Sequence, residues 1–155
     1  MLPAVLAAAL AFALPKHGVL VAGRSLGGVQ LGATQTDVRS AWGSFYGVCR
    51  SCPDETWYFT YRPFTSVGAG VSFRAGRAVA LFTLWAPPGW RTSRGLQIGE
   101  PEARVTAVYG AMPRVDCGTY AALLETRAGT TTAFYVRNGR VWGFGLSRAA
   151  VPVCR

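Results

Sequence analysis

An internal repeat is the feature that most constrains the fold of this chain. Residues 28–43 (GVQLGATQTDVRSAWG) return without a gap as residues 95–110 (GLQIGEPEARVTAVYG), an offset of 95 − 28 = 67 positions. Three glycines recur at this offset, and four further pairs keep their chemical type: Gln30/Gln97, Leu31/Ile98, Val38/Val105 and Trp42/Tyr109. A repeat of this length predicts a unit that is built twice. It names no substrate and no reaction.

Each copy is expected to contain one short helix. In the first copy, Thr34 and Asp37 have the spacing of a capping box, in which each side chain bonds to the backbone N–H of the other residue. Apolar residues follow at helical spacing, and Gly43 is placed to end the helix. In the second copy, Pro101 between two glutamates suits the first turn of a helix, and Gly110 suits its end.

Three strands rich in β-branched and aromatic residues are expected after each helix. They are placed at 56–61, 67–74 and 77–85 in the first copy, and at 120–126, 131–137 and 140–146 in the second, although 121–125 also suits a helix. The turns Gly76-Arg77 and Gly139-Arg140 recur at 139 − 76 = 63 positions, so the segment before the turn is shorter in the second copy. Asn138-Gly139 is typical of a type I′ hairpin turn.

The expected fold class is therefore α+β, with two tandem units that each pack a short helix on a three- to four-stranded antiparallel sheet. Units this small bury too little apolar surface to be stable alone, so we expect a shared core or covalent staples. Pro87 and Pro88 disfavour helix and central strand between the units. The predicted boundaries are a first repeat at 25–85, a Pro-rich linker at 86–94, a second repeat at 95–147 and a tail at 148–155.

This order of elements resembles the β-lactamase-inhibitor-protein family and the small outer-membrane lipoproteins that accompany barrel assembly. The resemblance rests on the run from Gly28 to Gly43, its second copy and the two Gly-Arg turns, and it covers about residues 26–147. It implies tandem helix-plus-sheet units and a binding role, not a named target. The inhibitor's contact residues match no position here, and the cysteines depart from one disulfide per repeat.

The N-terminus is expected to be a secretory signal. Residues 2–14 are uncharged and apolar, and Ala11-Phe12-Ala13 fits the small-x-small rule for cleavage. We place the signal peptide at 1–13, or at 1–22 at its longest. Pro15–Arg24 is expected to form a short leader. The alternative is that this segment is not cleaved and anchors the protein in the membrane, which is the only membrane contact expected. The apolar segment is, however, shorter than the roughly 20 residues of a spanning helix.

Four cysteines in an exported chain most simply form two disulfides. Cys49, Cys52, Cys117 and Cys154 allow three pairings. We favour Cys49 with Cys52, and Cys117 with Cys154, which would tether the tail to the second unit. The C-x-x-C pair Cys49/Cys52 also allows a thiol-disulfide oxidoreductase, but it follows a helix where the redox motif begins one. A zinc ribbon needs a second tight pair, which is missing.

The net charge of +9 comes from 15 arginines and one lysine against seven acids. A basic surface would favour an anionic partner such as a wall polymer or lipid headgroups. The arginines are scattered, however, and no run of Lys or Arg exceeds one residue, so nucleotide bias in the source genome also explains the composition. No specific nucleic-acid partner is expected.

Conventional catalytic motifs are missing from the sequence. The single histidine, His17, lies in the leader, so His-activated nucleophiles and His metal ligands are not expected. Asp54 and Glu55 are neighbours in a loop, and a glycosidase-like acid pair stays open. The sequence predicts no enzyme, no cofactor and no metal site.

Aromatic side chains exceed what strand alternation can bury, so some are expected at a recognition site with arginines. The candidate binding residues are Trp90 and Arg91 in the linker, Tyr58 on the opposite side of its strand from Trp57, and Arg62 and Phe64 in a loop. A linker tryptophan that fills the gap between the units is the alternative. We expect an exported, non-catalytic binding or inhibitor-like module for a protein or an anionic cell-envelope component. The alternatives are the oxidoreductase and a structural envelope protein.

Overall fold

The computed structural model describes residues 14–59, 68–84 and 89–155. Within these ranges the chain forms two helices and twelve strands. In chain order they are β1 (Val19–Val21), β2 (Ser25–Leu26), β3 (Val29–Gln30), α1 (Gln35–Trp42), β4 (Gly47–Cys49), β5 (Glu55–Tyr58), β6 (Gly68–Arg74), β7 (Arg77–Leu84), β8 (Arg91–Thr92), α2 (Ala103–Tyr109), β9 (Arg114–Asp116), β10 (Ala121–Arg127), β11 (Thr130–Arg137) and β12 (Arg140–Arg148).

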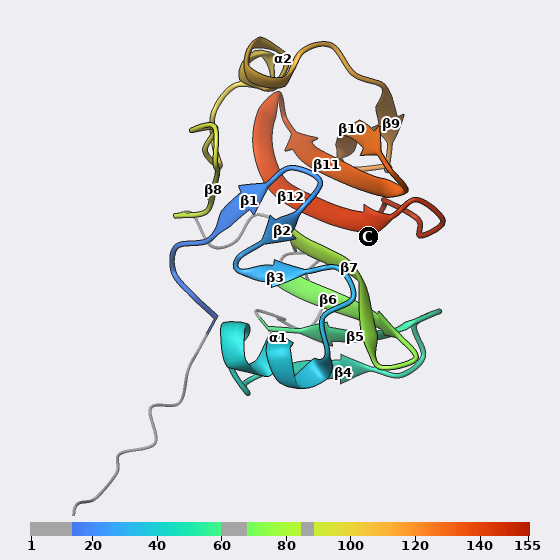
Figure 1. Ribbon diagram of the computed structural model, residues 1–155. Helices are drawn as coiled ribbons and strands as arrows, with labels where there is room; N and C mark the ends of the chain where they lie inside the picture. Colours follow the sequence, from blue (N-terminus) through green and yellow to red (C-terminus); the bar gives the residue numbers. More distant parts are fainter. Residues whose placement is uncertain (1–13, 60–67, 85–88) are drawn as a thin grey trace, which may run out of the picture.

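Eight of the strands form one continuous antiparallel sheet in the order β4-β5-β6-β7-β12-β11-β10-β9. Its centre is the pair β7–β12, drawn side by side in Figure 1, where Leu84 lies opposite Gly143 and Ala80 opposite Ser147. The predicted fold class is therefore wrong: the described chain is mostly β, and the strands after α1 and after α2 share a single sheet. The sequence could not show this, because alternation within a strand does not say which strand is its neighbour.

Four short strands form a second sheet in the order β3-β2-β1-β8. Two of these strands, β1 and β8, lie where the sequence analysis placed no strand. Strand β1 lies in the expected leader and β8 in the expected linker, and the two strands pair in parallel. Linker residues 86–88 and a signal at 1–13 fall outside the described residues. A signal that reached residue 22 would include β1, whose Leu20 is buried in the core.

Both helices end at the predicted glycines but begin differently. The capping box of α1 is present, with the Asp37 N–H donating to Thr34 Oγ1 at 3.1 Å and the Thr34 N–H donating to Asp37 Oδ2 at 2.9 Å. Gly43 and Gly110 follow the helices with φ of 95° and 87°, which glycine adopts readily. Helix α2 begins only at Ala103, after Pro101, which lies in an isolated bridge with Arg140 instead.

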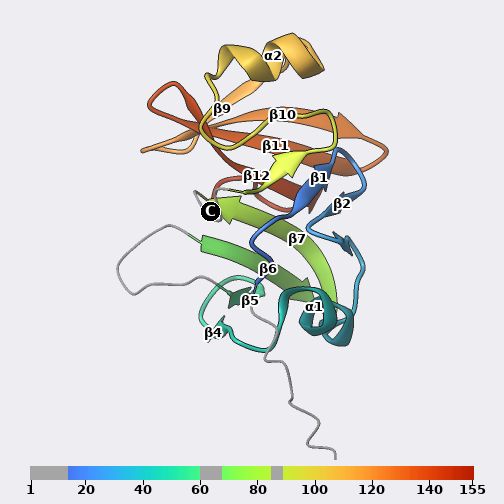
Figure 2. The same ribbon diagram turned by 90° about the vertical axis from the view of Figure 1, so that its left-hand side faces the viewer.

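The large sheet buries apolar side chains on both of its faces. One face packs against the second sheet and against α1 and α2, which lie at opposite ends of the molecule in Figure 2. The other face carries Phe82, Leu84, Tyr120, Ala122, Ala133, Tyr135 and Trp142. The tail contacts this second face, since the Tyr135 hydroxyl donates to Val153 O at 2.6 Å and the Arg155 guanidinium lies 5.1 Å from the Phe82 ring centre.

Two disulfides are present, Cys49–Cys52 and Cys117–Cys154, in the pairing favoured from the sequence. The first joins the end of β4 to the following turn. The second ties the tail to the segment between β9 and β10. Because disulfides persist mainly in oxidising compartments, the two bonds indicate a location outside the reducing cytosol. In the part of the chain that the structure describes, no helix is long and apolar enough to cross a membrane.

Candidate functional site

Among the sequence-predicted binding residues that the structure describes, Trp90 and Tyr58 belong to different packed clusters. Trp90 is fully buried, packs edge-on against Trp42 at 5.6 Å between ring centroids, and donates from Nε1 to Pro15 O at 2.9 Å. Its expected exposure is therefore wrong, and the alternative of a tryptophan inside the molecule is correct. Nothing in the sequence indicated that Trp90 is buried, because strand β8, which directly follows it, was not predicted.

Of the other predicted residues, the structure describes Arg91, which directly follows Trp90 in the chain, and Tyr58. Arg91 is exposed on β8. Tyr58 lies on the second face of the large sheet, half-buried, with its ring 6.0 Å from that of Phe82. Arg62 and Phe64 fall outside the described residues. The expectation that Tyr58 faces away from Trp57 is met, but that face carries a packed aromatic cluster of its own.

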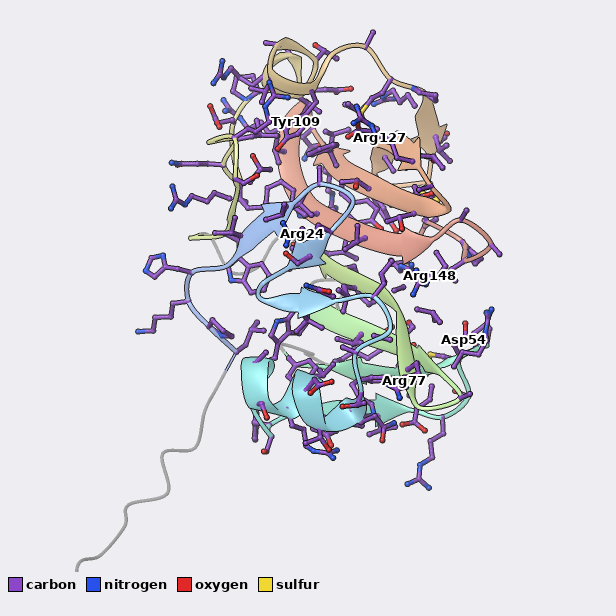
Figure 3. The ribbon with its side chains drawn as sticks, viewed as in Figure 1. Arg24, Asp54, Arg77, Tyr109, Arg127 and Arg148 are labelled. Carbon is purple, nitrogen blue, oxygen red and sulfur yellow. A yellow bond between two sulfur atoms is a disulfide. The ribbon has the colours of Figure 1, made fainter. Side chains whose placement is uncertain are left out.

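Exposed arginines instead line one surface of the molecule. In the view of Figure 3, Arg127, Arg24, Arg148 and Arg77 follow one another from the upper to the lower part of the molecule, with Asp54 between the last two, and all four arginines are exposed. We call this surface the basic face. It is assembled from β10, the β1–β2 turn, β12 and β7, which are far apart in sequence. The arginines are scattered along the chain, so the sequence did not show that the fold places them on one surface.

Most of the positive charge on the basic face is not neutralised by a carboxylate. Ion pairs among the described residues join Arg74 to Asp54, Arg104 to Glu100, Arg114 to Glu102 and Arg127 to Glu125. None of these pairs includes Arg24, Arg77 or Arg148. Within the described structure, Arg24 and Arg148 are thus exposed without an ion pair, whereas Arg77 donates to Gly32 O and its charge acts on Asp37.

A small cavity opens at the Arg127 end of the basic face, and we call it the Tyr109 pocket. It has a volume of about 190 Å³ and is lined by Ala22, Gly23, Arg94, Tyr109, Glu125, Arg127, Thr130 and Thr132. The Arg94 guanidinium lies 5.0 Å from the Tyr109 ring centre. Burial raises the pKa of the Tyr109 hydroxyl, so the group stays a neutral donor at physiological pH. Arginines, a phenol and threonines suit a polar, anionic group.

A wider depression, the Gly32 hollow, lies at the other end of the basic face. It has a volume of about 430 Å³ and is lined by residues 28–33 and Asp37. Arg77 Nη1 donates to Gly32 O at 3.3 Å, and Arg148 Nη2 lies 3.4 Å from where a Gly32 β-carbon would stand. Bonds from the Thr34 backbone and side chain, and the charge of Arg77, hold the pKa of Asp37 below its usual value.

Neither of the two cavities is lined by a histidine or a cysteine. Among the residues that the structure describes, no three His, Cys, Asp or Glu side chains gather closely enough to hold a metal ion. The cysteines at positions 49 and 52 are joined to each other and lie outside both cavities. Guanidinium groups line the Tyr109 pocket and lie next to Gly32 beside the other hollow, and each cavity is also lined by one carboxylate, Glu125 in the pocket and Asp37 in the hollow.

Comparisons with known proteins give a distant likeness of fold. No family model and no curated protein matches the sequence. An extracellular protein containing an SCP domain, from Bacillus anthracis str. Ames, is similar over 76% of this chain at 12% identity and a TM-score of 0.52. This chain spans 44% of that protein's length. A DUF4309 family protein (YjgB) from Bacillus subtilis is similar over 75% of this chain and 78% of its own, at 8% identity and a TM-score of 0.44.

Proposed function

We propose that this protein is a non-catalytic binding module that acts outside the reducing cytosol and holds an anionic cell-envelope component on its basic face. The observation that carries the proposal is the set of three exposed arginines, Arg24, Arg77 and Arg148, none of which belongs to an ion pair among the described residues. A cluster of one sign of charge attracts an extended polyanion and raises its association rate. The two disulfides agree with the proposed location.

The test measures binding of the purified protein to two soluble polyanions, polyphosphate and poly-L-glutamate, with neutral dextran as the reference. The variant Arg24→Gln/Arg148→Gln removes two charges from the basic face. The matched control, Arg50→Gln/Arg91→Gln, removes two exposed charges from the β4–β5 turn and from β8. Because an exposed ion pair contributes about 0.2–1 kcal/mol, we expect the first variant to bind roughly 2- to 30-fold more weakly.

Binding should also weaken as salt rises, since screening shortens the reach of exposed charges. Equal loss in both double variants would show that net charge alone controls binding, and the basic face would not be the site. Wild-type protein that prefers neither polyanion over dextran would overturn the proposed function.

A further inference from the structure

Each helix ends in an aromatic residue at the same position of the repeat. These residues are Trp42 in α1 and Tyr109 in α2 (109 − 67 = 42). Trp42 is fully buried, whereas Tyr109 is half-buried and lines the Tyr109 pocket. Because both residues belong to copies of one sequence segment, the surroundings of Trp42 serve as the reference for those of Tyr109.

Two aromatic side chains pack against Trp42. The Phe59 ring lies edge-on to it at 5.4 Å between ring centroids, and the Trp90 ring lies edge-on at 5.6 Å. All three rings are buried, and a β-carbon on Gly18 or Gly27 would overlap the Trp90 ring. Close packing of aromatic rings therefore fills the space beside the first helix.

The residue equivalent to Phe59 in the second half is Glu125. The Phe59 N–H donates to Ala69 O at 2.9 Å, and Glu125 lies opposite Thr132 on β11. Ala69 and Thr132 correspond at the offset of the two hairpin turns (132 − 63 = 69). Glu125 lines the Tyr109 pocket. A carboxylate therefore stands beside Tyr109 where an aromatic ring stands beside Trp42.

Small residues lie beside Tyr109 where the first helix has Trp90. Trp90 lies at one end of β1, since the N–H of the next residue donates to Gly18 O at 3.0 Å. The turn at the other end of β1 supplies Ala22 and Gly23 to the Tyr109 pocket. A β-carbon on Gly23 would meet nothing within 4 Å. The second helix thus has an open cavity where the first has an indole ring.

The lining of the Tyr109 pocket has the groups that contact a planar heteroaromatic ring. Such a ring has apolar faces and an edge that forms hydrogen bonds. A guanidinium stacks on aromatic faces, and Arg94 lies at the pocket, 5.0 Å from the Tyr109 ring centre. The Thr130 hydroxyl and the Glu125 carboxylate, which also line the pocket, are hydrogen-bonding partners for the edge.

The volume of the pocket limits the ligand to one small ring system. The cavity measures about 190 Å³. An engineered cavity of about 150 Å³ holds benzene, whereas pockets for drug-sized ligands measure roughly 300–1,000 Å³. The size of the cavity is therefore that of a single ring or a fused pair of rings.

We infer that the Tyr109 pocket binds a small molecule with a planar heteroaromatic ring, which stands beside Tyr109 as the Trp90 indole stands beside Trp42. This inference goes beyond the proposed function, because ring binding does not require the polyanion or the positive charge of Arg24 and Arg148. Indole is the matching probe, since it is the ring that the first half supplies from its own chain.

The test follows backbone amide signals by NMR while indole is added to the full chain. We expect saturable shifts in residues 22–23 and 130–132, which surround the pocket, and none at Trp42 or Gly27, where Trp90 already fills the space. Cyclohexanol, a ring of similar size without π faces, should bind roughly 2- to 10-fold more weakly.

A variant that fills the pocket tests the site. Ala22→Trp places an indole next to Gly23 and should remove the saturable shifts caused by free indole. Ala150→Trp adds the same side chain at an exposed position outside the pocket and should bind indole as the wild type does.

A second variant covers the case in which Ala22→Trp does not fold. Arg94→Gln removes the exposed guanidinium from the pocket and should weaken indole binding roughly 2- to 30-fold. Its control is Arg91→Gln, which removes an exposed charge of β8 outside the pocket and should leave indole binding unchanged.

Each outcome decides the inference. Absence of saturable indole shifts in residues 22–23 and 130–132 would overturn the site, as would unchanged binding in folded Ala22→Trp or in Arg94→Gln. Cyclohexanol binding as tight as that of indole would overturn the assignment to a planar ring. Polyanion binding without indole shifts would remove the inference and leave the proposed function intact. Indole binding in a protein that prefers neither polyanion over dextran would support the pocket and overturn only the proposed function.

Discussion

Gly143 on β12 lies directly against the backbone of Thr83 on β7. A β-carbon on residue 143 would overlap the Thr83 carbonyl oxygen and stand 2.8 Å from its carbonyl carbon. Next to this contact, the Phe144 N–H donates to Thr83 Oγ1 at 3.1 Å. The strand pair that joins the two halves of the large sheet thus depends on a residue without a side chain.

We expect Gly143→Ala to destabilise the protein at this junction. Overpacking costs typically 1–3 kcal/mol, and the upper end applies here because the neighbouring atoms are backbone and cannot rotate away. Gly47→Ala is the matched control, since Gly47 also lies in a strand and a β-carbon there would meet nothing within 4 Å. Urea unfolding monitored by circular dichroism measures the free energy of unfolding of both variants. Equal stability of the two variants would show that the junction tolerates a side chain.

The two disulfides should differ in their contribution to stability. The Cys117–Cys154 bond closes a loop with a sequence separation of 37, against 3 for Cys49–Cys52. In the chain-entropy model these loops correspond to about 4 and about 2 kcal/mol. Each cysteine pair is replaced by serines in turn, and the midpoints of thermal unfolding of the two variants are compared. The variant without Cys117–Cys154 should have the lower midpoint. A larger loss for the Cys49/Cys52 pair would show that native contacts outweigh loop length.

Stability should fall in alkaline solution because of buried tyrosines. Burial raises the pKa of Tyr135 from 10.0 to about 12, and it raises the pKa of Tyr109 and Tyr120 in the same direction. A phenol that ionises more easily in the unfolded chain gives stability that is complete below pH 10 and lost as the pH rises towards 12. For Tyr135 a shift of this size corresponds to about 3 kcal/mol.

Tyr135→Phe isolates this effect. The variant should lose about 1 kcal/mol at neutral pH, because its hydroxyl no longer donates to Val153 O, and it should lose less further stability above pH 10 than the wild type. Urea unfolding at several alkaline pH values, with tyrosinate absorbance recorded in parallel, measures the slope. Identical slopes for both proteins would assign the alkaline loss to other groups.

Trp90→Ala should affect stability and leave polyanion binding unchanged. Trp90 is fully buried against Trp42, and a β-carbon on Gly18 would stand 2.5 Å from its ring, so the truncation leaves a cavity within close packing. Large-to-small changes of this kind cost about 3–5 kcal/mol. Wild-type stability combined with loss of binding would restore Trp90 as a recognition residue, as the sequence suggested.

Local features were more predictable from the sequence than long-range ones. The capping box of Thr34 and Asp37 and the positive φ of both Asn138 and Gly139 follow from short-range chemistry that neighbours in sequence supply. The sequence allowed three disulfide pairings, and the favoured one, a local pair and a bond that tethers the tail, is present in the structure. The resemblance to the inhibitor and lipoprotein families stays a prediction.

Pairing between distant strands could not be predicted. Val19–Val21 has no periodicity long enough to identify a strand, and its partner Arg91–Thr92 follows two prolines. For the same reason the sequence did not show that Arg24, Arg77 and Arg148 lie on one face. One signal was available: the repeat has Tyr109 in place of Trp42, and the Tyr109 pocket lies beside this residue.

The pairing of β1 with β8 sets an order for assembly. A chain that emerges N-terminus first delivers Leu20 early, but one neighbour of its strand arrives only with Arg91 and Thr92. Until then the edge of β1 is unpaired, and unpaired strand edges with apolar side chains promote aggregation. A nascent chain that pauses before residue 92 is therefore expected to expose this edge.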